Sequence, residues 1–374
     1  MINKFHTFFA FLFFAPIFIS ITNNGGIVFD RFHFRDLEIF SLTLPVSLII
    51  ALILLSMNFF QILLKKEVFL FSLLSIFAIL LNVLTAENSS YLNVVLKVLF
   101  FILILFSFEH YFKKFKDIPI GLSPYKALMF VLVLSILSAI IYRADVYYFI
   151  SKEVAIYNFQ QYFPIIFILL MGICAHRKSL FIFLLSLSGA MFLSIAAQNL
   201  TSIFIVLTFS ALWLFTFFIN QELLKQLSLG VTFLCVMLPF LYFFLAVIFF
   251  DSLNPLLPES LATRVEGVYM FFNNASWSDI IFPIQLDPNV PGDHYHNEPI
   301  SILSTIGIVG TLLFYLIILN KIIQLNNNYP YIAISISLVI FFGGLTILPL
   351  LHPYTGIIIA YVISYYSSKS SSVD

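Results

Sequence analysis

Residues 96–106 read LKVLFFILILF, and this stretch decides the class of fold. Apart from Lys97 it is apolar throughout, and its side chains do not alternate between apolar and polar as those of a membrane β-barrel strand would. Apolar runs of about 17 to 24 residues recur along the whole chain, which is the length that a helix needs to cross roughly 30 Å of hydrocarbon. The stretch therefore predicts a membrane-spanning helix, and the chain predicts many of them.

The composition excludes an ordinary soluble protein. Of the 374 residues, 61% are hydrophobic and 10% are charged, whereas soluble domains average about 25% charged residues. The net charge is zero and no basic run is present, so we expect no nucleic-acid partner. Cys174 and Cys235 both lie inside apolar runs, where they are better interpreted as small buried hydrophobes than as a disulfide or metal pair.

We predict an all-α fold: a polytopic integral membrane helix bundle of about 12 transmembrane helices that forms a single domain over residues 1–374. The first apolar run lacks a convincing signal-peptide cleavage site, so we retain it as the first span. Twelve spans place both termini on one side of the membrane. The predicted spans are 5–22, 37–60, 68–86, 92–111, 127–142, 162–175, 180–197, 202–219, 229–250, 299–319, 331–350 and 354–366.

The distribution of basic residues predicts which side is cytoplasmic. Lys and Arg are concentrated in the cytoplasmic loops of membrane proteins. The side of the N-terminus holds twelve of them, namely Lys4, Lys65, Lys66, Lys113, Lys114, Lys116, Lys126, Arg177, Lys178, Lys225, Lys321 and Lys369. The other side holds five, namely Arg31, Arg35, Arg143, Lys152 and Arg264. Lys97 lies within the fourth predicted span, where it either extends to the interface or contacts a diphosphate.

A loop of 48 residues, 251–298, separates the ninth and tenth predicted spans on the non-cytoplasmic side. Its stretch 258–276 reads PESLATRVEGVYMFFNNAS, with apolar residues at helical spacing, and predicts an amphipathic helix at the membrane surface. This helix either packs at the interface or grips a substrate. Arg264 is the only Lys or Arg in the loop, and its guanidinium either binds a phosphate bidentately or forms a salt bridge with Glu259 or Asp293.

The loop ends in the stretch 292–310, GDHYHNEPISILSTIGIVG, where polar residues precede the tenth span. Asn297 is a good N-cap and Pro299 suits a first helical turn, so His296 and Glu298 should stand at the N-terminus of this span. A histidine there can accept a proton from a hydroxyl group near neutral pH. The small residues that follow predict close packing of another helix; they are Ser301, Ser304, Gly307, Gly310 and Thr311.

The histidines leave two further interpretations open. Either His296 acts alone or it acts as a pair with His294. Metal binding by the two histidines with Asp293 or Glu298 is disfavoured, because their i, i+2 spacing fits no zinc pattern that we can name. We therefore predict neither a metal site nor a cofactor.

The sequence resembles one known family at this point. His296 and Asn297, then nine residues, then GIVG resemble the His-Asn-x9-Gly-x-x-Gly pattern of the O-antigen polymerase and O-antigen ligase superfamily. The resemblance implies a bundle of about twelve helices in the cell inner membrane, with both termini cytoplasmic and the large loop periplasmic. It also implies glycosyl transfer from an undecaprenyl-diphosphate-linked glycan without a metal, in steps of lipopolysaccharide or related polysaccharide biosynthesis. A chain-length regulator and a flippase are the partner proteins that it suggests, beside the lipid bilayer.

On this resemblance His296 looks like the histidine that activates the acceptor hydroxyl, and Arg264 looks like the arginine that holds the diphosphate. Further substrate contacts are expected from Asn297, His294, Glu298, Arg143, Arg31, Arg35 and His352. His352 lies at the outer end of the eleventh span, where it either faces the cavity of His296 or only marks the interface. The chain departs from the family at AAQNLTSIF, where Ser-Arg is common, so a second phosphate contact must come from elsewhere.

Polymerase and ligase share the motif. We favour a polymerase, because the chain is short and the loop holds few basic residues for binding a phosphorylated lipid A core. A lipid-linked glycan flippase is the alternative from another class. It is disfavoured by the absence of a detectable internal repeat and by the length of the loop.

Overall fold

A computed structural model describes most of the chain. It covers residues 18–22, 27–30, 40–85, 90–114, 123–141, 156–196, 200–250, 257, 259–274, 280–281, 297–345 and 349–370.

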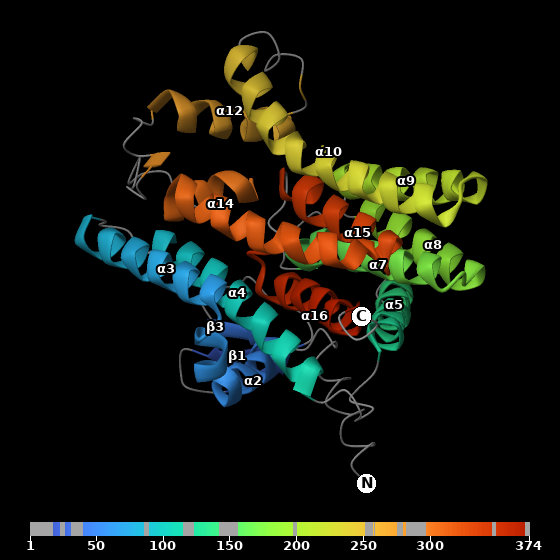
Figure 1. The fold of residues 1–374 in the computed structure, drawn as a ribbon, viewed down its shortest axis with the longest axis horizontal. Helices are drawn as coiled ribbons and strands as arrows, with labels where there is room; N and C mark the ends of the chain where they lie inside the picture. The colour runs from blue at the N-terminus through green and yellow to red at the C-terminus, as the bar shows by residue number, and fades with distance from the viewer. Residues whose placement is uncertain are drawn as a thin grey trace.

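Helices dominate the described residues, as the sequence predicts (Figure 1). From 68–86 onward, each predicted span overlaps a helix, although the span predicted at 331–350 is helical only as far as Leu345 among the described residues. The helices are α2 (Val46–Leu63), α3 (Lys66–Thr85), α4 (Ser90–Lys114), α5 (Pro124–Ile141), α7 (Ile156–His176), α8 (Leu180–Ala196), α9 (Leu200–Phe215), α10 (Gln221–Ile248), α12 (Glu259–Asn274), α14 (Glu298–Asn326), α15 (Pro330–Ser337) and α16 (Pro353–Ser370). Short helical turns of other types extend α9 and α15; they are η1 (Thr216–Phe218), η4 (Leu338–Phe342) and η5 (Gly343–Leu345).

A small antiparallel sheet near the N-terminus corrects the ends of the first two predicted spans. Its strands, in the order β2-β1-β3, are β1 (Phe18–Thr22), β2 (Ile27–Asp30) and β3 (Phe40–Pro45). The span predicted at 5–22 thus ends in a strand, and the span predicted at 37–60 becomes helical only at Val46. Pro45 explains this boundary, because proline disfavours helical backbone in the residue before it and has no N–H to donate within a helix.

Within the described residues, four helices are long and apolar enough to cross a membrane: Val94–Lys114, Leu200–Phe218, Gln221–Ile248 and Glu298–Asn326. A fifth span arises if Ser47–Leu63 and Lys66–Leu81, which meet at an angle of 105°, count as one. Where side chains are described, shorter apolar stretches of 10–17 residues lie in α5, α7, α8 and the segment from α15 to η5. The number of twelve spans is therefore not confirmed, while the helical membrane class fits the structure.

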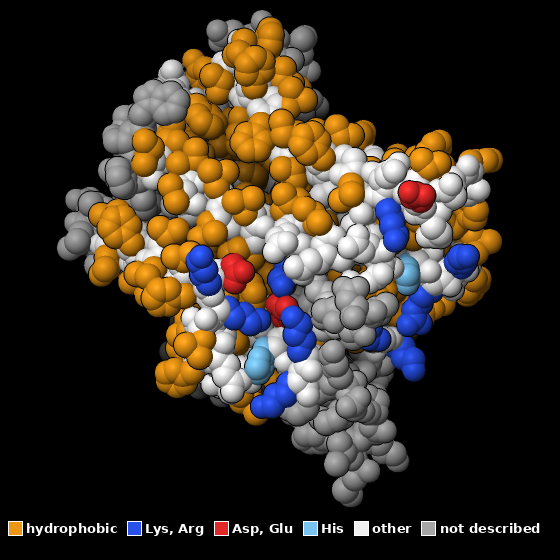
Figure 2. Space-filling view, in the orientation of Figure 1, with side chains coloured by type: hydrophobic (Ala, Val, Ile, Leu, Met, Phe, Trp, Pro, Cys, Tyr) orange, Lys and Arg blue, Asp and Glu red, His pale blue; other side chains and the backbone are white. Residues whose placement is uncertain are grey.

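α14 is central to the bundle. It contacts α10 on one side and α3, α4 and α16 on the other, with α12 beside α10 (Figure 1). Large apolar side chains cover much of the outer surface, including Phe60 at 82% exposure and Phe218 at 86% (Figure 2). Exposed apolar surface on this scale suits contact with lipid rather than with water.

Helix ends that the sequence assigns to one side of the membrane lie together. The ring of Tyr329, just after α14, lies 4.9 Å from that of His176 at the end of α7 and 4.9 Å from that of Tyr366 in α16. The Asn326 amide donates a 3.2 Å hydrogen bond to the carbonyl of Lys225 near the start of α10. The ends of α7, α14 and α16 and the start of α10 therefore form one end of the bundle.

Candidate functional site

The start of α14 is fixed by Asn297, which is fully buried. Its side-chain oxygen accepts a 3.1 Å hydrogen bond from the Ile300 N–H, so it caps the helix as predicted. Its amide nitrogen donates a 3.1 Å hydrogen bond to the Leu345 carbonyl at the end of η5. The side chain of Asn297 thus caps α14 and also bonds it to the segment that follows α15.

Glu298 extends this connection to the start of α16. It is fully buried, and its Oε1 accepts hydrogen bonds from the backbone N–H of Leu350 at 2.7 Å and of Leu351 at 2.9 Å. A buried carboxylate is costly unless donors surround it, so these two amides account for part of its stability. No local sequence pattern predicts this contact, because the donors are backbone groups of two leucines 52 and 53 residues away.

Gly307 interrupts α14 one third of the way along the helix. Its φ of 67° and ψ of 177° lie outside the helical region, in a part of conformational space that side-chain-bearing residues rarely adopt. The Thr311 hydroxyl donates a 2.7 Å hydrogen bond to the Gly307 carbonyl across the break. The first glycine of the His-Asn-x9-Gly-x-x-Gly pattern is thus in a backbone conformation that favours glycine, which the sequence did not predict.

The hydroxyl groups of this region bond to the backbone of their own helix. The Ser304 hydroxyl donates to the Ser301 carbonyl at 3.1 Å, and the Thr305 hydroxyl donates to the same carbonyl at 2.9 Å. These side chains therefore donate to backbone carbonyls of their own helix, in the turns before the break at Gly307.

The predicted amphipathic helix of the large loop is α12, and it packs on the first turns of α14. Its buried residues Val265, Val268 and Phe271 form one apolar cluster with Ile300 and Leu303. Arg264, next to Val265, is partly exposed, and its charge interacts with the hydroxyl of Tyr242 in α10. The structure thus packs the helix of Arg264 on α10, and its buried face shares an apolar cluster with the first turns of the motif helix.

An apolar cavity of about 650 Å³ lies between α10, α12 and α14. Among its lining residues are Phe243, Phe272, Pro299, Leu303 and Tyr315. Figure 2 shows hydrophobic side chains gathered around a hollow in this part of the molecule. The cavity therefore begins at the first turn of α14 and runs along its apolar face.

Two buried polar atoms lie near the start of this cavity. The Oε2 of Glu298 and the hydroxyl of Tyr315 have no hydrogen-bond partner among the described residues, and the two groups interact electrostatically. Buried polar groups in native proteins are normally paired. Of these two residues, Tyr315 is among those that line the cavity.

His352 follows directly after the two residues that Glu298 holds. It is partly buried, and its carbonyl accepts a 2.9 Å hydrogen bond from the Gly356 N–H in the first turn of α16. Leu350 and Leu351 also line a second cavity of about 310 Å³, which Lys97 borders. The structure therefore brings His352 and Lys97 to the region around the start of α14.

The remaining predicted site residues lie outside the described residues. They are His296, His294, Arg31, Arg35 and Arg143. Their positions relative to Asn297 and Arg264 thus stay predictions. Where side chains are described, no group of three or more His, Cys, Asp or Glu residues lies close enough together to bind a metal ion.

Comparison with known proteins does not add a family assignment. No family model, no curated protein and no solved structure matches the chain.

Proposed function

We propose that this chain is a glycosyltransferase that polymerises undecaprenyl-diphosphate-linked oligosaccharide repeat units at the periplasmic face of the inner membrane. The product is O-antigen or a related surface polysaccharide. One observation carries the proposal: the stretch that resembles the family pattern is a fixed helix start, with buried Asn297 and Glu298, beside a helix that bears Arg264.

The proposed reaction needs few groups, because a diphosphate is already a good leaving group. His296 removes a proton from a hydroxyl of the acceptor sugar, and the freed oxygen attacks the anomeric carbon of the donor sugar. The bond from that carbon to the diphosphate oxygen breaks, and undecaprenyl diphosphate leaves with the electron pair. Arg264 neutralises the departing charge. The attack is a single inverting displacement, so isolation of a covalent glycosyl-enzyme intermediate would count against it.

Positioning is the main task that this chemistry leaves to the protein. In the proposal, the start of α14 that follows His296 is held by the bonds of Asn297 to Leu345 and of Glu298 to Leu350 and Leu351.

The cavity beside α14 is an argument for a lipid-linked substrate. Its walls are apolar, and several of its lining residues, including Phe240 and Leu316, are more than half exposed on the outer surface of the bundle. A polyprenyl chain can enter such a cavity from the bilayer while its diphosphate remains near Arg264 and the start of α14.

The test is the surface glycan made by cells that lack this gene and carry plasmid copies at matched expression. Wild type should restore a ladder of repeats, whereas His296→Ala and Arg264→Ala should leave a single repeat on the lipid core. Arg264→Lys should also fail to restore most of the ladder, because an ammonium cannot bind a phosphate bidentately.

Glu266→Gln is the matched control, since Glu266 lies on the same helix as Arg264, two residues away and partly exposed. It should restore the full ladder. Loss of all core-attached glycan, with polymer still on its lipid carrier, would identify a ligase instead. Full complementation by both alanine variants would reject the catalytic assignment and favour a transporter.

A further inference from the structure

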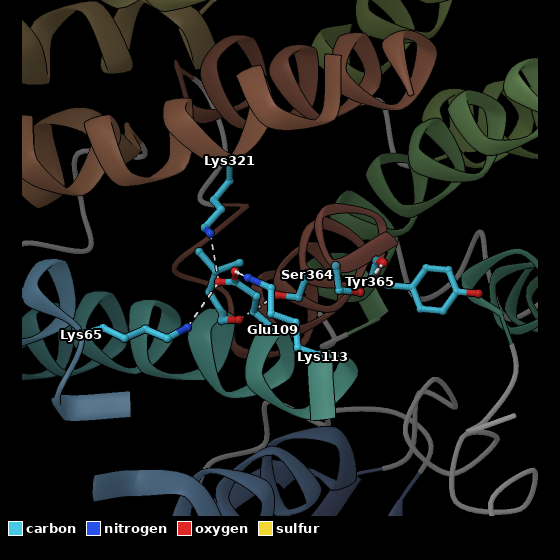
Figure 3. Close-up of polar contacts among 8 residues, drawn as sticks. Lys65, Glu109, Lys113, Lys321, Ser364 and Tyr365 are labelled. Carbon is cyan, nitrogen blue, oxygen red and sulfur yellow. Dashed lines mark hydrogen bonds and ion pairs between the residues drawn. The ribbon is translucent and has the colours of Figure 1, made fainter. Parts of the chain in front are cut away.

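A second buried carboxylate lies far from the candidate site. Glu109, in α4, has a side chain that is 6% exposed and is surrounded by three lysines (Figure 3). The ammonium group of Lys113 lies 2.7 Å from its carboxylate, that of Lys321 lies 2.9 Å away and that of Lys65 lies 3.6 Å away. We call these four residues the Glu109 cluster. Lys321 is 23 residues beyond Glu298, so the cluster lies toward the other end of α14 from the motif.

The Glu109 cluster carries an excess of positive charge. Three ammonium groups face one carboxylate, which leaves two positive charges if all four groups are ionised. The ring of Phe106 offsets part of this excess, with Lys65 at 4.6 Å and Lys321 at 5.2 Å from its centroid. Like charges this close together repel one another, so a further anion would stabilise the arrangement.

The three lysine side chains of the cluster differ in how much of each is exposed. The side chain of Lys321 is 10% exposed, that of Lys65 is 29% exposed and that of Lys113 is 45% exposed. Lys321 therefore forms the floor of the site, and Lys65 and Lys113 form a rim that an incoming anion can reach.

The surroundings of Lys65 identify the kind of anion. Lys65 lies in the turn between α2 and α3, and the neighbouring side chains Phe60, Leu64 and Phe69 are 82%, 86% and 54% exposed. A small soluble anion gains nothing from these apolar groups, whereas the acyl chains of a lipid can cover them. Basic pockets between membrane helices commonly bind lipid headgroups for this reason.

We propose that the Glu109 cluster binds the phosphate of an anionic phospholipid, with Lys65 and Lys113 as its direct ligands and Lys321 beneath them. All three lysines belong to the set that the sequence places on the cytoplasmic side, so the lipid comes from the cytoplasmic leaflet. This site is independent of the proposed glycosyl transfer, because it uses none of the residues of the α14 motif.

The experiment is a titration of the full-length protein in detergent with phosphatidylglycerol and with phosphatidylcholine, followed by native mass spectrometry. We expect wild type to bind phosphatidylglycerol about tenfold more tightly than phosphatidylcholine, and Lys65→Gln to lose most of this preference. Lys66→Gln is the matched control: Lys66 is the next residue, is exposed and takes no part in the cluster. It should bind both lipids as wild type does.

A second variant separates lipid binding from a purely structural role. Glu109→Gln removes the carboxylate that competes with the phosphate, so it should bind phosphatidylglycerol more tightly than wild type does. If the cluster only joins α4 to α14, this variant gains no affinity. Because that substitution can also impair folding, Lys65→Arg provides a milder check, and it should retain the preference.

Three results would overturn the proposal. One is the absence of any preference in wild type, and another is an equal loss in Lys65→Gln and Lys66→Gln, which would indicate general surface attraction. The third is displacement of the bound lipid by inorganic phosphate at an equal concentration, which would mean that the site takes a soluble phosphate and not a lipid.

Discussion

Glu298 and Glu109 are both buried carboxylates packed at α14, one at its first residue and the other beside Lys321 near its end. Glu298 accepts its hydrogen bonds from neutral backbone amides, whereas Glu109 faces three ammonium groups. The amides fix the position of Glu298 and carry no charge of their own. The ammonium groups more than neutralise Glu109. A glutamate therefore fixes the backbone at one end of α14, and another glutamate pairs with positive charges near the other end.

The largest effect should come from removing the carboxylate of Glu298. In Glu298→Ala, the buried N–H groups of Leu350 and Leu351 lose their acceptor, at about 1–3 kcal/mol each. We expect the free energy of unfolding in detergent to fall by about 4 kcal/mol. Glu298→Gln keeps an oxygen in place as the acceptor, so its free energy of unfolding should fall by no more than about 1 kcal/mol. If Glu298→Gln lowers the free energy of unfolding as much as Glu298→Ala does, the carboxylate group itself matters more than an oxygen in that position. The contrast with Glu109 would then fail.

A smaller effect is expected from Gly307, which lies between the two ends. Gly307→Ala forces a side chain onto a φ of 67° and a ψ of 177°, which costs about 1–3 kcal/mol. Gly230→Ala is the control, because Gly230 is inside α10 with nothing within 4 Å of an added Cβ atom. That substitution should be neutral or stabilise the protein by up to about 1 kcal/mol. Equal unfolding free energies for the two variants would mean that the break in α14 is not needed.

Much of the geometry around α14 is predictable from local sequence. Asn297 and Pro299 marked the start of the helix, and the apolar spacing of 258–276 predicted α12. These signals work because helix caps and amphipathic faces depend on residues within a few positions of one another. The late start of α2 was missed, although Pro45 stands at that boundary, because the run 37–60 was judged by its apolar content.

The contacts that give the two carboxylates their roles were not predictable in the same way. The bond from Leu350 to Glu298 joins residues 52 positions apart, and Lys321 and Glu109 are 212 positions apart. The basic-residue distribution did place Lys65, Lys113 and Lys321 on one side of the membrane. Which carboxylate they would meet depends on how α4 packs against α14, and no local pattern in a single sequence records that packing.

The smallest effect should come from Lys113, and it differs from that of Glu298 in how the destabilisation changes with salt. Lys113 is 45% exposed, so its ion pair with Glu109 should contribute only about 0.5 kcal/mol to stability. In 1 M NaCl the screening length falls to about 3 Å. The destabilisation caused by Lys113→Gln should therefore nearly vanish there, whereas that caused by Glu298→Ala should not change, because buried hydrogen bonds to backbone amides are not screened. Chemical unfolding of both variants at about 0.1 M and 1 M NaCl provides the measurement. If the destabilisation caused by Glu298→Ala also changes with salt, water and ions must reach the start of α14. The two ends of the helix would then not differ in the kind of interaction that holds their carboxylates.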